Sequence, residues 1–205
     1  MAEGRPARLQ NSLEKIAGRW WLALLFVLLF FIPPLTAKPV DPRDAPQLIV
    51  AVFSQAIIYA RPALFPLFKL LPMLCLVLLL IFKNKAAPLF TLYAAVNLLL
   101  AAVGENIAVT AEYGRVILIA NIAMTLPVAL AWLLECLARR GDYARPRLGQ
   151  AVWLCMPLAL LAFWFPVDLR TLRPDFNPLY LLTSEAGLTF CQMVPVYLTV
   201  LLLYY

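Results

Sequence analysis

The chain has 205 residues, of which 64% are hydrophobic and only 14% are charged. Soluble domains contain roughly 45–50% apolar and about 25% charged residues, so this composition excludes an ordinary soluble globular domain and indicates an integral membrane protein. The chain contains no histidine, which removes the most frequent general base and the commonest metal ligand. Because each crossing needs about 20 residues, the length allows six or seven spans and little else.

The net charge of +6 does not indicate a nucleic-acid partner. The basic residues lie beside apolar runs, where they set membrane topology and meet anionic lipid head groups. The cysteines are far apart and form no CxxC pair, so we expect no metal site, no redox pair and no cofactor. They are Cys75, Cys136, Cys155 and Cys191.

Residues 1–19 form a cytoplasmic amphipathic segment. Leu9, Leu13 and Ile16 recur at helical spacing among basic residues, a pattern typical of a helix that lies on the membrane surface. The first expected span follows at 20–36. Its basic start, apolar run and small residues near the end also match a cleavable signal peptide, but we interpret it as a retained anchor.

The apolar stretch at 47–60 is too short to cross the bilayer. As a helix it would measure about 21 Å, whereas the hydrocarbon core is about 30 Å thick. Asp44 could cap its start, and the pair Arg61-Pro62 would end it. We therefore expect an interfacial or re-entrant helix over 47–60.

Five further apolar runs complete an all-α bundle of six transmembrane helices, and 20–205 is interpreted as one polytopic transmembrane domain. Loops that contain charges or proline separate these runs. The expected spans after the first are 64–82, 88–104, 115–137, 148–165 and 178–205. The sequence leaves open whether the natural chain continues past Tyr205.

The distribution of basic residues favours six spans over seven. With six spans and both termini in the cytoplasm, ten basic residues face inside and six face outside, as the positive-inside rule requires of a cell-membrane protein. If 47–60 also crossed, each side would hold eight. The inside set is Arg5, Arg8, Lys15, Arg19, Lys83, Lys85, Arg139, Arg140, Arg145 and Arg147, and the outside set is Lys38, Arg43, Arg61, Arg115, Arg170 and Arg173.

Proline recurs inside the expected spans, at Pro72, Pro127, Pro157 and Pro195. Proline lacks a backbone donor and clashes with the preceding turn, so each position should kink its helix or free a carbonyl. Transporters use broken helices at binding sites. Membrane helices are generally rich in proline, however, and the structural interpretation is favoured.

The sixth expected span carries the most informative pattern. Glu185, Thr189, Gln192 and Thr199 follow one helical face. A carboxylate at the centre of the bilayer costs about 2.5–3.5 kcal/mol on insertion scales, so this stripe should face other helices or a wet cavity. Glu185, Thr189 and Gln192 are therefore candidate binding residues, with interhelical hydrogen bonding as the alternative.

Lys69 is the expected partner of Glu185. At helical rise, Lys69 lies about 7 Å and Glu185 about 8 Å inside the outer ends of their spans. Opposite charges at one depth can pair and stay ionised together. The alternative is that the Lys69 side chain extends to the outer head groups along its own stem.

Two asparagines complete the candidate binding site. Asn97 lies among small residues on one face of the third span, where helices can approach closely. Asn121 lies four residues before Thr125 in the fourth span. For Asn97, close packing of helices that this side chain bridges is the favoured alternative.

No catalytic residue is predicted, because GxSxG, Walker, HExxH and GxGxxG motifs are all absent. Three functional classes stay open. The first is a small-molecule binding or transport module with a polar site in the outer half of the bundle, and the second is a non-catalytic structural or assembly subunit of a larger membrane complex. The third, a membrane enzyme acting on a lipid, is disfavoured by the missing motifs. The expected partners are the lipid bilayer, other membrane subunits or a second copy, and an unidentified small molecule.

Overall fold

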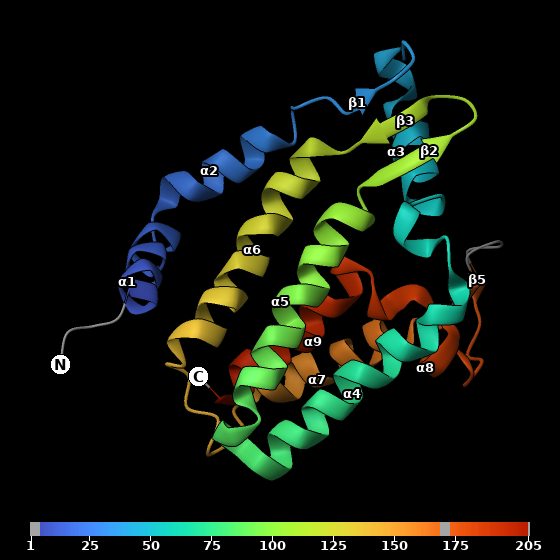
Figure 1. Ribbon diagram of the computed structural model, residues 1–205. Coiled ribbons are helices and arrows are strands. Elements are labelled where there is room, and N and C mark those ends of the chain that lie inside the picture. Colours follow the sequence, from blue (N-terminus) through green and yellow to red (C-terminus); the bar gives the residue numbers. More distant parts are fainter. Residues whose placement is uncertain (1–4, 169–172, 205) are drawn as a thin grey trace. The chain divides into compact units, whose positions relative to one another are not determined.

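The computed structural model describes residues 5–168 and 173–204 and is 70% helical (Figure 1). Three helices in this part of the chain are long and apolar enough to cross a membrane: Pro62–Lys85, Ala87–Gly104 and Ile119–Ala138. They correspond to the second, third and fourth expected spans, and the all-α membrane class fits the structure. Shorter apolar helices occupy the other apolar runs, at Trp20–Leu29, Ala45–Ser54, Gln150–Trp164 and Phe190–Tyr204.

The chain forms two compact units, each assembled from two separate stretches of sequence. The first unit comprises 1–60 and 94–140, and the second comprises 61–93 and 141–205. Helix α5 (Ala87–Gly104) begins in the second unit and ends in the first. Each unit buries apolar side chains of its own.

The first unit combines helices with a small sheet. In chain order its elements are α1 (Arg5–Ala17), α2 (Trp20–Leu29), β1 (Leu35–Thr36), a 3-10 turn at Pro42–Asp44, α3 (Ala45–Ser54), a 3-10 turn at Ile57–Tyr59, the end of α5, β2 (Ile107–Thr110), β3 (Gly114–Ile117) and α6 (Ile119–Ala138).

The amphipathic segment near the start of the chain forms α1, and α1 packs against α6. The Gln10 amide donates a 2.8 Å hydrogen bond to the Glu135 carboxylate. The guanidinium of Arg140 donates to the side chain of Asn11. Both bonds join α1 to the last turns of α6 and the residues that follow it, and they hold this helix on the first unit.

Helix α2 is shorter than the first expected span. It has 10 residues, about 15 Å at helical rise, and it ends before the pair Pro33-Pro34. A single proline can lie within a helix, but here Pro34 also disfavours the α conformation of the residue before it, Pro33, so the two successive prolines prevent the helix from continuing. The residues after the prolines, Leu35–Thr36, instead form strand β1.

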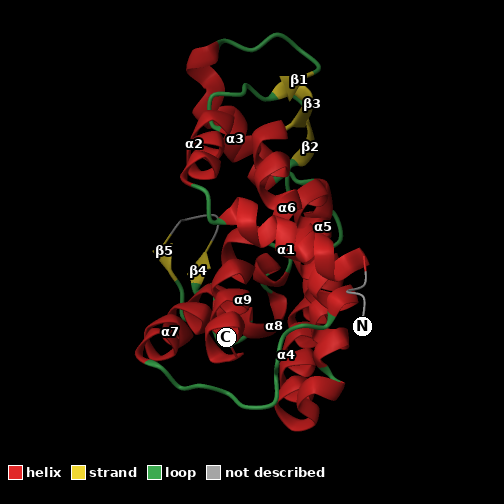
Figure 2. Cartoon of the chain, turned by 90° about the vertical axis from the view of Figure 1, so that its left-hand side faces the viewer, coloured by secondary structure: helices red, strands yellow, loops and turns green. Residues whose placement is uncertain are grey.

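The first unit contains a three-stranded antiparallel sheet, which the sequence did not predict. Strands β2 and β3 form a hairpin, and β1 pairs with the other edge of β3, giving the order β1-β3-β2 (Figure 2). Gly114 begins β3 with a φ of +70°, a backbone conformation that favours glycine. Because β3 occupies 114–117, the fourth span begins at Ile119 and not at the expected Arg115.

Helix α3 packs on this sheet and forms the core of the first unit. Leu48 and Val52 of α3 are buried together with Ala108, Val116 and Leu118. The helix begins directly after Asp44, as expected, although the Asp44 side chain makes no capping hydrogen bond. It ends at Ser54, so the single helix expected over 47–60 is divided into a helix and a separate 3-10 turn.

The second unit is built from helices and a short strand pair. In chain order its elements are a 3-10 turn at Pro62–Leu64, α4 (Phe65–Phe82), a 3-10 turn at Lys83–Lys85, the start of α5, α7 (Gln150–Trp164), β4 (Val167–Asp168), β5 (Arg173–Pro174), α8 (Tyr180–Thr183), a 3-10 turn at Glu185–Gly187 and α9 (Phe190–Tyr204). Helices α7 and α9 lie side by side. The four prolines predicted to lie within helices do so, in α4, α6, α7 and α9.

The segment between α6 and α7 is held against the end of α4 by one asparagine. The Asn84 side chain donates to the Asp142 carboxylate over 2.9 Å and accepts from the Tyr143 backbone N–H over 2.6 Å. The hydrogen bond from Asn84, with a second from the Ala144 N–H, lowers the pKa of Asp142. Tyr143 is buried, and its ring packs 5.2 Å from that of Tyr204. This loop is therefore an ordered part of the second unit.

Candidate functional site

Lys69 is buried inside a helix that is otherwise almost wholly apolar. It lies in the second turn of α4, whose sequence is FPLFKLLPMLCLVLLLIF, and its exposed fraction is 0%. A charged ammonium in an apolar interior needs hydrogen-bond partners and opposite charge to stay ionised. The groups around the Lys69 ammonium nitrogen define the candidate site.

The first partner of the Lys69 ammonium is the carboxyl end of α7. The ammonium donates to the backbone carbonyl of Phe163 and lies 4.2 Å from the centre of the Phe163 ring. The last carbonyls of a helix have no partner within it, and the helix dipole makes this end negative. Lys69 of α4 therefore caps α7 and places its charge at the negative pole of that helix.

A second side chain caps the same helix end. The single proton of the Ser184 hydroxyl is shared between two carbonyl acceptors, that of Tyr180 at 2.9 Å and, more weakly, that of Trp164 at 3.4 Å. The Trp164 indole N–H in turn donates to the Asn177 carbonyl over 3.0 Å. The carboxyl end of α7 is thus joined to the segment that leads into the last helix.

The sixth expected span is broken, which corrects the continuous helix predicted over 178–205. Helix α8 ends at Thr183, Ser184 is extended, a 3-10 turn covers Glu185–Gly187, and α9 begins only at Phe190. The turn can approach the backbone of α4 this closely only because residue 187 is a glycine. A Cβ at this position would lie 2.5 Å from the Phe68 carbonyl oxygen. The turn therefore packs directly on the backbone of α4, beside Lys69.

Glu185 lies in this turn and is half-buried. Its carboxylate is an opposite charge close enough to interact electrostatically with the Lys69 ammonium. The ammonium thus contacts a helix carbonyl and an aromatic ring, and the Glu185 carboxylate acts on it as a nearby negative charge. Unlike Lys69, Glu185 keeps part of its surface accessible.

Thr189 and Gln192 differ in what they contribute. The Thr189 hydroxyl donates to the Glu185 carbonyl over 3.2 Å, which stabilises the turn and uses the hydroxyl locally. Gln192 lies in α9, and its side-chain oxygen is buried without a hydrogen-bond partner in the described part of the chain. Because the break precedes α9, Glu185 does not share one continuous helical face with Gln192, which corrects the predicted stripe.

The remaining two candidate residues belong to the first unit. Asn97 is buried in α5, with an exposed fraction of 1%. Asn121 is half-buried near the start of α6 and lines a cavity of about 560 Å³. The structure therefore groups Lys69, Glu185, Thr189 and Gln192 in the second unit.

Sequence reasoning missed three residues that shape the site: Phe163, Ser184 and Gly187. Phe163 acts through its backbone carbonyl, which no sequence pattern marks. Ser184 and Gly187 flank Glu185, and a small polar residue and a glycine so close together could have indicated a break in the helix. The structure shows no group of three or more cysteine, aspartate or glutamate side chains that could hold a metal ion within the residues it describes.

Comparison of the chain with protein-family models, with curated proteins and with solved structures gave no match.

Proposed function

We propose that the protein is a six-span protein of the cell membrane that binds or transports a small molecule at a polar site built around Lys69 and Glu185. The observation that carries this proposal is the fully buried ammonium of Lys69 in an apolar candidate span. Ionisable residues inside membrane helices are costly, pair with one another or with backbone carbonyls, and mark ligand or ion pathways.

The break between α8 and α9 supports the same proposal. Transporters place binding sites at discontinuous helices, where backbone groups are freed from the helical ladder. Here the break carries Glu185, a residue that is partly accessible. A ligand that carries a protonated amine would share this carboxylate with Lys69, so we propose small organic amines as the substrate class.

The six-span topology extends what the three long helices support. Helices α7 and α9 have 15 residues each, about 22 Å at helical rise, and further apolar residues adjoin them. We propose that both cross, as does the segment that begins with α2. Both termini then lie in the cytoplasm, in keeping with the excess of basic residues on that side.

This topology predicts opposite accessibility for two exposed loops. With the four native cysteines replaced by serine, we introduce Lys85→Cys and Arg173→Cys separately. In intact cells, an impermeant thiol reagent should label the cysteine at 173 and should leave the cysteine at 85 unlabelled until the cells are opened. Labelling of 85 but not 173 in intact cells would contradict the six-span arrangement, because it inverts these loops.

Ligand-induced stabilisation tests the proposed function. The purified protein is heated with a panel of amines, amino acids and organic acids, and at least one amine should raise its melting temperature. A ligand at a hundred times its Kd stabilises by about 2.7 kcal/mol, which is readily measured. The effect should disappear in Glu185→Gln and persist in Glu112→Gln, a matched change at an exposed residue in the hairpin turn of the first unit.

Two results would contradict the proposal. One is equal stabilisation of Glu185→Gln and of the unchanged protein by every compound that binds. The other is the absence of any stabilising compound together with a membrane protein that co-purifies at constant ratio, which would identify a structural subunit instead.

A further inference from the structure

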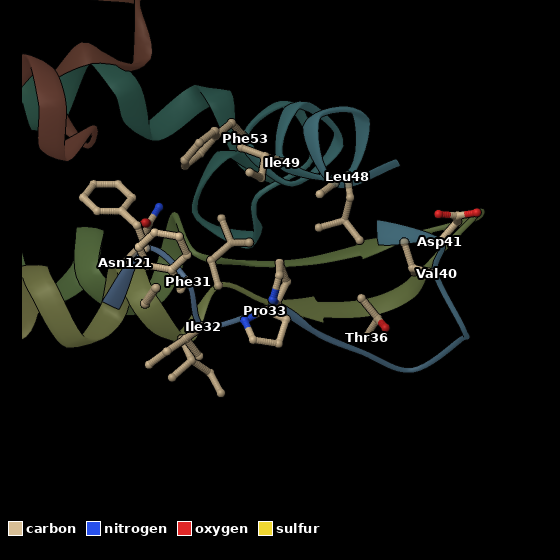
Figure 3. A pocket seen from close by; sticks show the side chains of 16 residues that line it. Phe31, Ile32, Pro33, Thr36, Val40, Asp41, Leu48, Ile49, Phe53 and Asn121 are labelled. Carbon is tan, nitrogen blue, oxygen red and sulfur yellow. The ribbon is translucent and has the colours of Figure 1, made fainter. Parts of the chain in front are cut away.

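The first unit contains an apolar cavity of about 560 Å³ that the Lys69 site does not involve. The residues that follow α2 form one wall, β1 and the chain leading into α3 form another, α3 covers a third side, and the start of α6 closes it (Figure 3). Its size falls within the range of about 300–1,000 Å³ that is usual for small-molecule sites. Most of its lining is aliphatic or aromatic.

Polar groups are few and occur at opposite ends of the cavity. Asn121 lies at one end, beside Phe31, and Asp41 lies at the other (Figure 3). One oxygen of the Asp41 carboxylate already accepts the Arg43 N–H over 2.9 Å, and the Thr36 hydroxyl donates to the Lys38 carbonyl. Among the residues that the structure describes, no lysine or arginine lines the cavity, so none of them would neutralise an anionic ligand there.

Asn121 offers the cavity an uncharged hydrogen-bonding group. The backbone carbonyl of Asn121 accepts a hydrogen bond from the Thr125 hydroxyl over 2.8 Å. Its side-chain amide has two N–H donors and one carbonyl acceptor, and it lines the cavity (Figure 3). A carbonyl or hydroxyl group on a ligand matches this amide, whereas a charged group gains less there.

The rim of the cavity is apolar and adjoins a candidate span. The side chains of Phe30 and Phe31 are 71% and 79% exposed, and Ile119 and Ala120 begin the span Ile119–Ala138. Exposed aromatic side chains next to a spanning helix are suited to the boundary between hydrocarbon and head groups. A ligand can therefore enter from the lipid phase.

We propose that this cavity binds a neutral single-chain amphiphile, with its alkyl chain against the apolar lining and its carbonyl or hydroxyl group on Asn121. The site is independent of the proposed amine site, because it is formed entirely by residues of the first unit.

Photo-crosslinking of the full-length protein in phosphatidylcholine nanodiscs tests this proposal. The probe is a monoacylglycerol with a diazirine in its alkyl chain. Crosslinks should be concentrated in residues 30–36, 45–53 and 118–121, and added monooleoylglycerol should compete for them. Oleate, which has the same chain and an anionic head, should compete at least tenfold less well.

Two neighbouring substitutions in α3 provide a matched pair. Ile49 lines the cavity, whereas Val50 is 68% exposed and does not. Ile49→Trp should fill the cavity and abolish the competed crosslinks, and Val50→Trp should leave them intact. Asn121→Leu should weaken binding of monooleoylglycerol by about fivefold, the size of one hydrogen bond. Melting temperatures of all three variants confirm that each is folded.

Several results would overturn the proposal. Crosslinks spread evenly over lipid-facing helices, or crosslinks that monooleoylglycerol does not compete for, would show ordinary contact with the bilayer. Equal labelling of Ile49→Trp and Val50→Trp would place the ligand elsewhere. Tighter binding of oleate than of monooleoylglycerol would reject a neutral ligand.

Discussion

Substituting Gly187 by alanine is expected to destabilise the protein strongly, whereas the same change at Gly149 should have little effect. A Cβ at residue 187 would lie 2.5 Å from the carbonyl oxygen and 2.8 Å from the carbonyl carbon of Phe68. These are backbone atoms of a helix, so they cannot move aside as a flexible side chain can. Overpacking of this kind typically costs about 1–3 kcal/mol, and here α4 and the turn would have to separate.

Gly149 is the matched control. It precedes the first residue of α7, with φ −79° and ψ 167°, and an added Cβ would meet no atom within 4 Å. Alanine is a poorer N-cap residue than glycine, which destabilises the protein. It also lowers the conformational entropy of the unfolded chain, which stabilises the folded protein. These effects offset each other to within about 0.5 kcal/mol. Thermal unfolding of both variants in detergent measures the contrast, and equal melting temperatures would contradict the close packing of the turn on α4.

The same variant also probes the site. If the turn separates from α4, Glu185 moves away from Lys69, because the turn carries both Glu185 and Gly187. Gly187→Ala should therefore lose amine-induced stabilisation along with intrinsic stability. Gly149→Ala should keep both.

A double-mutant cycle at Lys69 and Glu185 is expected to show strong coupling. Glu185→Gln keeps the shape of the side chain but removes the carboxylate, so the buried ammonium loses its counter-charge. Removing one partner of a fully buried pair costs about 3–5 kcal/mol. Because Glu185 is only half-buried, water replaces part of its interaction, and we expect about 1–3 kcal/mol.

Lys69→Met supplies the other arm of the cycle. It removes the ammonium together with the donor to Phe163, and the carbonyl left without a partner costs about 1–3 kcal/mol. In the double variant the loss of Glu185 no longer leaves a positive charge unbalanced. The double variant should therefore lose less stability than the sum of the two single variants, by at least about 1 kcal/mol. Additive losses would reject the electrostatic partnership and leave Lys69 as a helix cap alone.

Local patterns in the sequence were sufficient to predict the membrane class and the principal helices. The apolar runs at 64–82, 88–104 and 115–137 correspond closely to α4, α5 and α6, because length and hydropathy determine such helices. The amphipathic start forms α1, since its spacing of apolar residues is a local property. The pair Pro33-Pro34 could also have been used to end the first span earlier.

The hairpin and the break before α9 depend on contacts between distant residues. Ile107–Thr110 and Gly114–Ile117 are rich in β-branched side chains, a local signal for strands, but their burial depends on α3 and on β1 far away in the chain. The break at Ser184–Gly187 is stabilised by packing on Phe68. Neither contact leaves a periodic pattern in the sequence. A plain loop was therefore predicted in place of the hairpin, and a continuous helix in place of the break.

The candidate site was predicted in part for the same reason. The charges of Lys69 and Glu185 mark them in an apolar sequence, and their partnership follows from the need to balance charge. The hydrogen bond between Lys69 and Phe163 spans 94 residues and uses a backbone carbonyl, which every residue possesses. Residue type therefore indicates that these two charges interact, but it does not indicate the helix end that the ammonium binds.

The capping of α7 by Lys69 has a consequence for the biosynthesis of the protein. On the proposed topology, α4 leaves the ribosome and meets the membrane before Phe163 is made, 94 residues later. At about 5–20 residues per second, the ammonium waits roughly 5–20 seconds for its acceptor. A lysine at the centre of a helix costs about 2.5–3.5 kcal/mol on insertion and one near its end costs less; the mean hydropathy of 2.5 in this helix offsets that cost. On this topology, the strong hydrophobicity of α4 lets the helix insert before the Phe163 carbonyl, the later acceptor of the Lys69 ammonium, has been made.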